Sequence, residues 1–595
     1  MKTWRKVLGL LTPKEKRRGG LLIVMVVIMA VLETIGVASV IPFLSVLGDP
    51  AAIEETPYLY ALYQYFDFQS PNSFLTALGI AAFCIVLFSA VFRIITTYAI
   101  NRYTQMRRHS VGKRLLETYL RQPYAFFLNR HSGDMAKSIL SEVDQLTTNV
   151  IRPGFEAIAY TVVVLAIISF LVLNDPALAL GVGLVIGGSY VLIFSSVQRL
   201  LTRIGRERAD ANKERFTAAG EALGGIKDIK LLGREQAYLT RFTPSSVRFS
   251  RHQATNRTLS EVPRYMIEAI GYGGVIGLSL FLVVRSDGFG EVLPMLGLYA
   301  FAGSKLLPAA QKIYGGVAKL RFGSAAVDDI YDDLRERSSL AEIRKPVTER
   351  LRIKKSISLD RISFAYPESR EAALSDISLT IPKGTSIGLV GGTGAGKTTL
   401  VDIILGLLRP TEGDLKVDDS PITDQNLRQW QASLGYVPQD IFLVDATVSE
   451  NIALGIPLEN ISQDKVEQCA RMAQVHDFVT TQMPDGYNTQ VGERGVRLSG
   501  GQRQRIGIAR ALYHDPEILV FDEATSALDN ITEKAVMDAV NALSKEKTII
   551  MIAHRLSTVR QCDKIVYLEK GKVVSTGTYD QLLESSAGFS SLAAK

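Results

Sequence analysis

The sequence has few of the residues that build redox and metal centres. Only three cysteines and six histidines occur in 595 residues. The cysteines, Cys84, Cys469 and Cys562, lie far apart and match no spacing of metal ligands. This pattern excludes a disulfide scaffold. It indicates reduced thiols that pack as small apolar groups, as on a cytosolic face.

Charged residues are absent from several long stretches. Apolar residues make up 47% of the chain, and the mean hydropathy of +0.14 is high for a soluble protein. We therefore expect a membrane part combined with a soluble part. The basic first 18 residues precede an apolar stretch that is too long for a signal-peptide core, and no small-residue cleavage site follows. We expect a retained first membrane helix.

Six apolar stretches approach or exceed the roughly 20 residues that span a bilayer. They cover residues 21–47, 74–100, 153–173, 177–197, 263–284 and 289–318. The last two are glycine-rich and interrupted by charge, so we expect six spans with four as the lower bound. The first 18 residues hold seven lysines and arginines, whereas residues 48–73 hold none. Because basic and non-basic connections alternate in this way, both termini are predicted to be cytoplasmic.

A glycine-rich loop lies between a predicted strand and a predicted helix. Its sequence fits the pattern G-x-x-x-x-G-K-[ST] of a phosphate-binding loop. The loop residues are Gly391, Gly392, Thr393, Gly394, Ala395, Gly396, Lys397 and Thr398, and Thr399 follows in the helix. Glycines let backbone N–H groups turn inward to phosphate oxygens. We expect Lys397 to reach the β- and γ-phosphates of a nucleoside triphosphate, and Thr398 to ligate Mg²⁺.

Polar residues at predicted strand ends supply the remaining chemistry. Asp522 is placed to hold Mg²⁺ through water, and Glu523 beside it is placed to polarise an attacking water. Gln439 can reach the metal or the water. His554 can contact the γ-phosphate or orient Glu523, although a lone histidine at a strand end is usually structural.

A second anion site is predicted at the start of a basic helix. It consists of Leu498, Ser499, Gly500, Gly501 and Gln502. The N–H groups at a helix N-terminus favour negative charge. Two phosphate-binding faces with one phosphate-binding loop suggest that two copies of the chain share each nucleotide. Tyr366 is a candidate for stacking on the base, although a tyrosine in a strand more often packs in a core.

Together these motifs resemble those of ATP-binding-cassette half-transporters of the exporter type. The resemblance assigns Tyr366 to the aromatic loop, Gln439 to the Q-loop and His554 to the switch histidine. It assigns residues 498–502 to the signature, and Ser526 to Asp529 to the D-loop, so that Asp529 also faces the nucleotide. Because no motif is degenerate, the resemblance implies two working ATP sites in a homodimer, each holding ATP and Mg²⁺.

The same resemblance implies the architecture. It predicts an all-α membrane domain of exporter type with six transmembrane helices over residues 1–325. A linker over residues 326–355 and an α/β P-loop nucleotide-binding domain over residues 356–595 follow. Turns at 131–134 and 224–230, at the tips of two long cytosolic extensions, resemble the coupling helices of the family.

Four basic residues fall within the predicted spans. They are Arg93, Arg264, Lys305 and Lys312. Charges against lipid are costly, so each needs an explanation. One explanation is that long basic side chains snorkel to the inner interface. The other is a basic cavity for an anionic group such as a phosphate or pyrophosphate.

A narrower resemblance is to the PglK-type flippases of lipid-linked oligosaccharides. It rests on Glu33-Thr34-Ile35-Gly36, on residues 40–43, and on residues 262–264 ahead of 268–271. The aromatic-rich segment 57–68 resembles the short external helix of that family, although an ordinary packed loop is an equal alternative. The resemblance implies a polyprenyl-pyrophosphate-linked sugar that moves from the cytoplasmic to the outer leaflet of a bacterial inner membrane. It also implies that the four basic residues bind the pyrophosphate. Two of them are lysines where we would expect arginines, and a lysine lacks the bidentate fork.

Two alternatives stay open at this level. The first is an exporter of another amphiphile, such as a glycolipid, a peptide or a drug. The second is a membrane-tethered regulatory ATPase that senses rather than transports, although polar residues within the spans argue against it. No nucleic-acid partner is expected.

Overall fold

The structure is a computed structural model. It describes residues 2–130, 132–174, 176–285, 289–335, 349–367, 369, 371–492, 495–523, 533–534, 538, 547–553 and 555–593. The chain divides into two compact units. One contains Met1–Gln122 and Asn129–Ile343, and the other contains Pro123–Leu128 and Arg344–Lys595. Each unit is described by itself.

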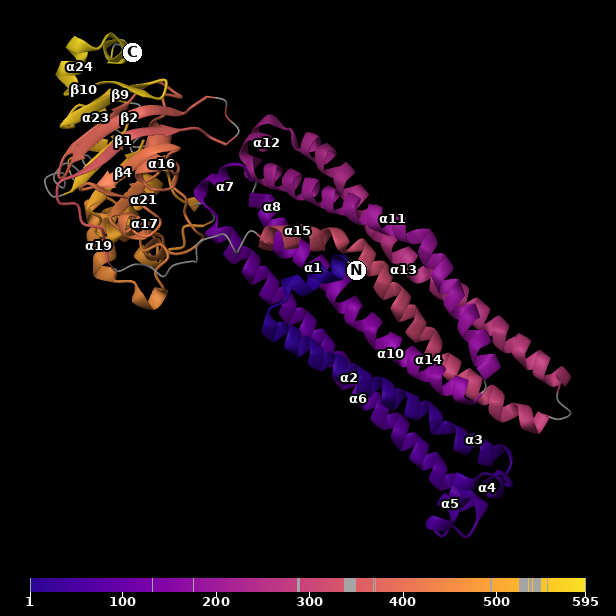
Figure 1. The fold of residues 1–595 in the computed structure, drawn as a ribbon. Coiled ribbons are helices and arrows are strands. Elements are labelled where there is room, and N and C mark those ends of the chain that lie inside the picture. The colour runs from indigo at the N-terminus through magenta and orange to yellow at the C-terminus, as the bar shows by residue number, and fades with distance from the viewer. Residues whose placement is uncertain are drawn as a thin grey trace. The chain divides into compact units, whose positions relative to one another are not determined.

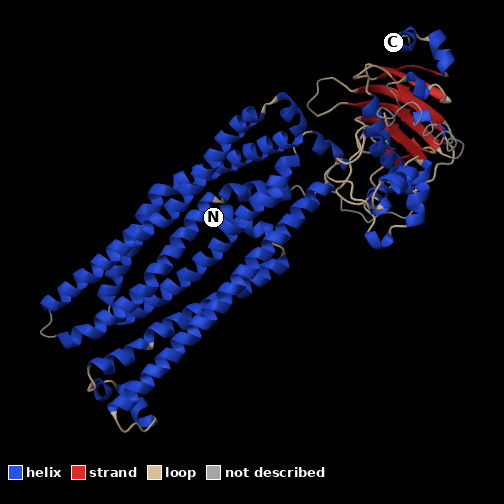
Figure 2. Cartoon of the chain, turned by 180° about the vertical axis from the view of Figure 1, so that it is seen from behind, coloured by secondary structure: helices blue, strands red, loops and turns tan. Residues whose placement is uncertain are grey.

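The first unit is entirely helical where it is described, and long helices run side by side in it (Figure 1, Figure 2). The long helices are α2 (Pro13–Ala38), α6 (Pro71–Arg121), α10 (Arg152–Asn174), α11 (Pro176–Gly224), α13 (Glu235–Arg285) and α14 (Phe289–Phe322). Shorter helices are α1 (Lys2–Leu10), α3 (Val40–Gly48), α4 (Ala52–Glu55), α5 (Pro57–Tyr65), α8 (Ser132–Ala136), α9 (Val143–Gln145), α12 (Ile226–Leu232) and α15 (Ser324–Arg335). Two π-helical turns, Lys137–Glu142 and Leu146–Ile151, flank α9. Helix α15 occupies the start of the segment 326–355 that we expected as a linker.

Three stretches of the described residues are long and apolar enough to cross a membrane: Pro13–Gly48, Pro71–Arg121 and Gly133–Leu173. They contain the first three predicted spans. The other three predicted spans fall on α11, α13 and α14, where many side chains lie outside the described residues. The first span is not one straight helix, because α2 ends at Ala38 and α3 begins at Val40. Pro42 explains the break, since its ring would clash with the carbonyl four residues earlier.

The aromatic segment after the first span forms helix α5. Leu59 is fully buried, and the ring of Tyr63 packs edge-on against Phe74 with centroids 5.3 Å apart. Tyr65 and Phe66 are exposed. The helix is therefore packed on one face and presents aromatic side chains on the other, which is the arrangement that an interfacial helix requires. Its contact with the membrane surface stays a prediction.

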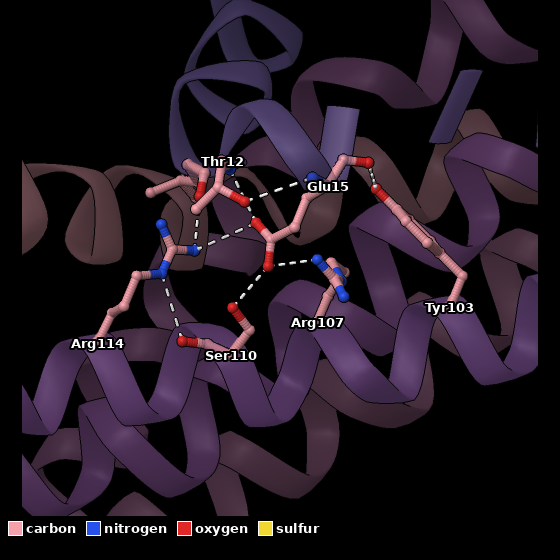
Figure 3. A network of polar contacts seen from close by, with 7 residues as sticks. Thr12, Glu15, Tyr103, Arg107, Ser110 and Arg114 are labelled. Carbon is pink, nitrogen blue, oxygen red and sulfur yellow. Dashed lines mark hydrogen bonds and ion pairs between the residues drawn. The ribbon is translucent and has the colours of Figure 1, made fainter. Parts of the chain in front are cut away.

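A buried carboxylate fixes the start of α2 on α6 (Figure 3). Glu15 pairs with Arg107, accepts a hydrogen bond of 2.6 Å from the Ser110 hydroxyl, and caps its own helix through the backbone N–H of Thr12 at 2.8 Å. The Arg114 guanidinium donates to the Leu10 carbonyl at 2.6 Å. Buried charges are tolerated when they are paired and hydrogen-bonded in this way.

The tip of the first extension, which we predicted to be cytosolic, lies earlier in the chain than expected. We expected a turn at residues 131–134, but α6 ends at Arg121 and a separate short helix, α7 (Tyr124–Leu128), follows. Pro123 explains the difference, because it forces Gln122 into an extended conformation with ψ 144°. At the second tip α11 ends at Gly224 and α12 follows, within and just beyond the predicted stretch 224–230.

In its described residues, the second unit contains two sheets. The six-stranded sheet has the order β10-β9-β3-β8-β7-β6. Its strands are β3 (Ser386–Val390), β6 (Leu434–Val437), β7 (Ile518–Asp522), β8 (Thr548–Ile552), β9 (Lys564–Glu569) and β10 (Lys572–Gly577). All neighbours in it are parallel except β9 and β10. Strands β3, β7 and β8 are buried along their whole length, as continuous apolar runs predict.

The second sheet is antiparallel with the order β2-β1-β4-β5. Its strands are β1 (Ser356–Phe364), β2 (Leu374–Pro382), β4 (Glu412–Val417) and β5 (Ser420–Pro421). Where this unit is described, its α-helices besides α7 are α16 (Lys397–Ile404), α17 (Leu427–Gln431), α18 (Val448–Ile452), α19 (Gln463–Met472), α20 (His476–Gln482), α21 (Gly500–Tyr513), α23 (Leu556–Val559), α24 (Tyr579–Ser585) and α25 (Ala587–Ala593). In a parallel sheet the polar groups at the carboxyl ends of the strands meet at one edge, which places the site.

Candidate nucleotide site

The phosphate-binding loop joins β3 to α16, as predicted. Gly394 and Gly396 adopt φ values of +77° and +95°, which only glycine adopts without strain. A Cβ on Gly391 would lie 2.3 Å from the Leu568 carbonyl oxygen, so the back of the loop is closed to side chains. A Cβ on Gly392 or Gly394 would meet nothing within 4 Å. The loop therefore has a packed back and an open front, which is the shape of a phosphate cradle.

Lys397 begins α16 and lies across this loop. Its ammonium donates to the carbonyl oxygens of Gly391 at 2.9 Å and Gly392 at 3.0 Å. Burial lowers the pKa of Lys397, while Glu523 and Asp522 nearby act in the opposite direction. The ammonium therefore lies beside both the loop and the carboxylates, where a phosphate oxygen can replace the two carbonyls as its acceptor.

Two carboxylates lie at the end of β7. Asp522 is buried and accepts a hydrogen bond of 3.4 Å from the Tyr436 hydroxyl. Glu523 follows with φ +49°, a left-handed conformation that is uncommon outside glycine. Its carboxylate accepts a hydrogen bond of 2.8 Å from the Gln439 side-chain amide. The structure thus brings together Gln439, Asp522, Glu523 and Lys397, all predicted from the sequence.

Asp402 was not predicted as part of this site. It lies on α16, and burial together with the charge of Asp522 raises its pKa to about 6. Burial and the same carboxylate also raise the pKa of Tyr436. A sequence signal existed, since Asp402 is a charge within the apolar second half of α16, residues 400–404. Burial, and then the nearby Asp522 carboxylate, make the charged form of Asp402 less favourable than it is in water.

The donor set fits Mg²⁺. Thr398 at the helix start and the carboxylate of Asp522 offer the oxygen ligands that Mg²⁺ prefers, and the Gln439 side chain lies beside them, with its amide nitrogen 2.8 Å from the Glu523 carboxylate. Bound there, the ion would supply positive charge to the β- and γ-phosphates.

Tyr366 and Thr399 lie close together beside the loop. Their hydroxyl oxygens are 3.1 Å apart, and the Tyr366 ring packs edge-on against Phe364 with centroids 5.0 Å apart. Thr399 is buried, so its side chain contacts the tyrosine rather than the open front of the loop. Stacking of Tyr366 on a base stays a prediction.

The signature residues start helix α21. Ser499 accepts a hydrogen bond of 3.2 Å from the Gln502 backbone, and the Gln502 side chain accepts one of 2.8 Å from the Ser499 backbone. This capping box was not anticipated, although Ser-x-x-Gln is its sequence pattern. Leu498 is buried, while Gly500 and Gly501 are partly exposed. The remaining N–H groups of the first turn are those that a phosphate would use. Asp529 and His554 lie outside the described residues.

In the membrane unit the structure describes three of the four predicted basic residues. Arg93 pairs with Glu33 at 3.4 Å, a partner that sequence reasoning did not assign to it. Opposite charges in two adjacent spans were the available signal. Lys312 is exposed and Lys305 is half-buried, both on α14. The side chain of Arg264 lies outside the described residues.

Each of the two units matches a known protein family. Residues 374–526 match the family model "ABC transporter", and residues 19–291 match "ABC transporter transmembrane region". The chain is 29% identical over 512 residues to an ATP-dependent lipid A-core flippase of Alkalilimnicola ehrlichii, covering 85% of both proteins. It is 32% identical to the heterocyst differentiation ATP-binding protein HepA of Nostoc sp., covering 84% of this chain and 81% of that protein.

A third relative and one solved structure complete the comparison. The putative multidrug export ATP-binding/permease protein YgaD of Bacillus subtilis is 29% identical, covering 81% of this chain and 83% of that protein. The solved structure of a bacterial Atm1-family ABC exporter with ATP bound has a TM-score of 0.78 at 23% identity, covering 97% and 98% of the two chains. It confirms the predicted fold. The chain belongs to the ABC transporter family, as an exporter half-transporter whose ATPase domain couples ATP hydrolysis to transport.

Proposed function

We propose that two copies of this chain form an ATP-driven flippase for a polyprenyl-pyrophosphate-linked oligosaccharide. The lipid moves from the cytoplasmic to the outer leaflet of a bacterial inner membrane, for protein glycosylation or surface glycan assembly. The observation that carries the proposal is the pair Lys305 and Lys312 on α14. Residues 292–311 contain no other charge than Lys305, and seven residues place both lysines on one helix face. Two ammonium groups at that spacing suit a diphosphate.

Arg93 has a smaller part in cargo binding than the sequence suggested. Its ion pair with the buried carboxylate of Glu33 offsets its charge, but the contact is long and 43% of the side chain is exposed. Turning Arg93 toward an anionic head group would leave the buried Glu33 carboxylate without its partner, so Arg93 is less available to the cargo than an unpaired base. Lys305 and Lys312 therefore contribute more to pyrophosphate binding than they would if all four basic residues contributed equally.

The nucleotide site supplies the energy. In this proposal Glu523 accepts the proton of the attacking water, and Gln439 holds the Glu523 carboxylate in place through its 2.8 Å hydrogen bond. Lys397 neutralises phosphate charge, and Ser499 of a second copy completes each site. Relatives named as lipid A-core flippases support a lipid as the cargo.

ATPase stimulation by purified lipids tests the substrate class. The dimer is reconstituted in zwitterionic vesicles, and ATP turnover is measured with a polyprenyl-pyrophosphate oligosaccharide, the monophosphate form, and the free polyprenol. We expect stimulation in that order, several-fold for the first and none for the last. Equal stimulation by all three, or by a cationic drug alone, would replace the proposal by export of another amphiphile, which the similarity to YgaD keeps as the second candidate.

A further inference from the structure

A basic cleft lies where α11 leaves the predicted membrane region. It has a volume of about 620 Å³ and is lined by four arginines, Arg199, Arg203, Arg206 and Arg321. The two carboxylates in its lining are Glu207 and Asp210. Four positive against two negative side chains leave an excess of two positive charges.

The sequence of α11 sets this arrangement. Arg199, Arg203 and Arg206 follow one another at four and three residues, so they form one stripe along the helix. The opposite face carries Leu201 and Ile204, which are buried against α14. The stripe is thus directed away from the packed face.

A glycine brings the fourth arginine to the stripe. A Cβ on Gly205 would lie 2.2 Å from the Phe322 carbonyl oxygen, so only glycine permits α11 and the end of α14 to approach this closely. Phe322 is fully buried in this contact, and Arg321 beside it is exposed. Two helices far apart in sequence therefore contribute to one basic surface.

Most of the arginines of this cleft form no ion pair with other described residues of the chain. Arg203 pairs with Glu207 at 2.7 Å. Among the residues that the structure describes, Arg199, Arg206 and Arg321 have no ion pair or side-chain hydrogen bond. Gln198 adds a neutral amide donor to the same lining, whereas the Thr202 hydroxyl in it donates to the Gln198 backbone carbonyl at 3.1 Å.

The depth of the cleft matches lipid head groups. Residues 176–198 carry no charge, and a helix of that length spans about 34 Å at 1.5 Å per residue. The hydrocarbon core of a bilayer is about 30 Å thick, with the head groups in the next several ångströms. Arg199 then lies at the edge of the hydrocarbon, and Arg203 lies about 6 Å farther out.

We propose that this cleft binds the phosphate of an anionic lipid from the cytoplasmic leaflet. A bias of basic residues toward the cytoplasm is ordinary for membrane proteins and by itself requires no site. Here, however, the arginines come from two helices, line a cleft and lie at head-group depth. Arginine presents planar donors that match phosphate oxygens. The site is separate from Lys305 and Lys312 and does not rest on the proposed cargo.

Lipid binding to the purified dimer tests the proposal without ATP or transport. Native mass spectrometry counts phosphatidylglycerol and phosphatidylcholine adducts on the wild type and on the triple variant Arg199→Gln, Arg206→Gln, Arg321→Gln. The matched control changes three exposed arginines outside the cleft, Arg102→Gln, Arg234→Gln and Arg251→Gln. Each basic residue near a membrane surface contributes roughly fivefold to anionic lipid affinity. The cleft variant should lose on the order of a hundredfold in phosphatidylglycerol affinity, and the control should lose less than a few-fold.

Three outcomes would overturn the proposal. Equal loss in both variants would reduce the effect to general surface charge. Displacement of phosphatidylglycerol by millimolar inorganic phosphate or pyrophosphate would make the cleft a soluble-anion site. Dissociation of the cleft variant into single chains on size exclusion would make this face an interface between copies. The double variant Lys305→Ala, Lys312→Ala should keep the phosphatidylglycerol preference, so a failure of the proposed cargo is distinguishable from a failure of this site.

Discussion

In the proposed mechanism, Glu523 is the residue on which ATP turnover depends. It is held in a left-handed conformation at the edge of the sheet and hydrogen-bonded by Gln439. Strain of this kind costs about 1–3 kcal/mol and persists where surrounding structure enforces it. Glu523→Gln should keep ATP binding but lose about 10²- to 10⁴-fold in turnover, because the amide accepts no proton. ATPase rates and nucleotide affinity on the same preparation measure both, and wild-type turnover in the variant would remove Glu523 from this role.

Asp402 gives the nucleotide site a dependence on pH. Its pKa is raised from 3.8 to about 6, so the folded state holds this proton more tightly than the unfolded chain. The stabilisation is complete below pH 3.8 and is lost as pH rises through about 6. Asp402→Asn should therefore match the wild type near pH 4 and become more stable than it above pH 6, by up to about 3 kcal/mol.

The measurement is the difference in melting temperature between variant and wild type, without nucleotide or Mg²⁺. Because both proteins contain the same other titrating groups, the contribution of those groups to the pH dependence cancels in the difference. Saturating Mg²⁺ and ATP should shrink it, because a cation beside Asp522 stabilises the charged form. A difference that is constant from pH 4 to pH 8 would show that Asp402 titrates normally.

At the scale of elements, the start of α21 has one observed role, helix capping, and one proposed role, binding the nucleotide of the second copy. Ser499 caps the helix, so Ser499→Ala should cost about 1 kcal/mol of stability. Ser499→Thr keeps the cap and should be near wild type. Ser499→Arg should in addition abolish turnover without weakening nucleotide binding to its own phosphate loop, because its proposed nucleotide belongs to the second copy.

Mixed dimers separate these two roles. Ser499→Arg is combined with Lys397→Ala either in one chain or in opposite chains. In opposite chains the two changes fall on one composite site and leave the other site intact. The same loss of ATPase in both arrangements would mean that the sites are not shared.

A buried ion pair joins two helical elements of the membrane unit. Arg208 on α11 donates to Glu142 at 2.8 Å and 3.4 Å, and both side chains are fully buried. Glu142→Gln should destabilise this unit by about 3–5 kcal/mol, because it leaves the guanidinium charge buried without its partner. Adding Arg208→Met should recover most of the loss. The exposed pair Arg248 and Glu214 is the control, and Glu214→Gln should change stability by less than about 1 kcal/mol.

Thermal unfolding is measured for the wild type, Glu142→Gln, the double variant Glu142→Gln with Arg208→Met, and the control Glu214→Gln. A double variant as unstable as Glu142→Gln alone would show that packing rather than charge dominates the site.

Local sequence patterns predicted helices, strands and loops well where a single feature of the sequence determined the structure. Continuous apolar runs predicted β3, β7 and β8, and the loop with Lys397 needed only the spacing of glycines. The tip of the first extension was misplaced because the hydrophilic residues 131–134 looked more turn-like than Gln122-Pro123, although the proline decides the backbone there. Opposite charges in adjacent spans were a signal for the pair of Arg93 with Glu33. The contact itself, like that of Arg208 with Glu142, depends on which helices become neighbours and in what register.

For the whole molecule the central claim is that ATP hydrolysis moves a pyrophosphate-linked glycolipid. The most direct measurement is flipping of a fluorescent polyprenyl-pyrophosphate oligosaccharide in sealed proteoliposomes, followed by lectin protection. The wild type should flip only with ATP, and Glu523→Gln should not flip. Lys305→Ala with Lys312→Ala should nearly abolish flipping while basal ATPase survives. Wild-type flipping by the double lysine variant, or no ATP-dependent movement by the wild type, would contradict the account.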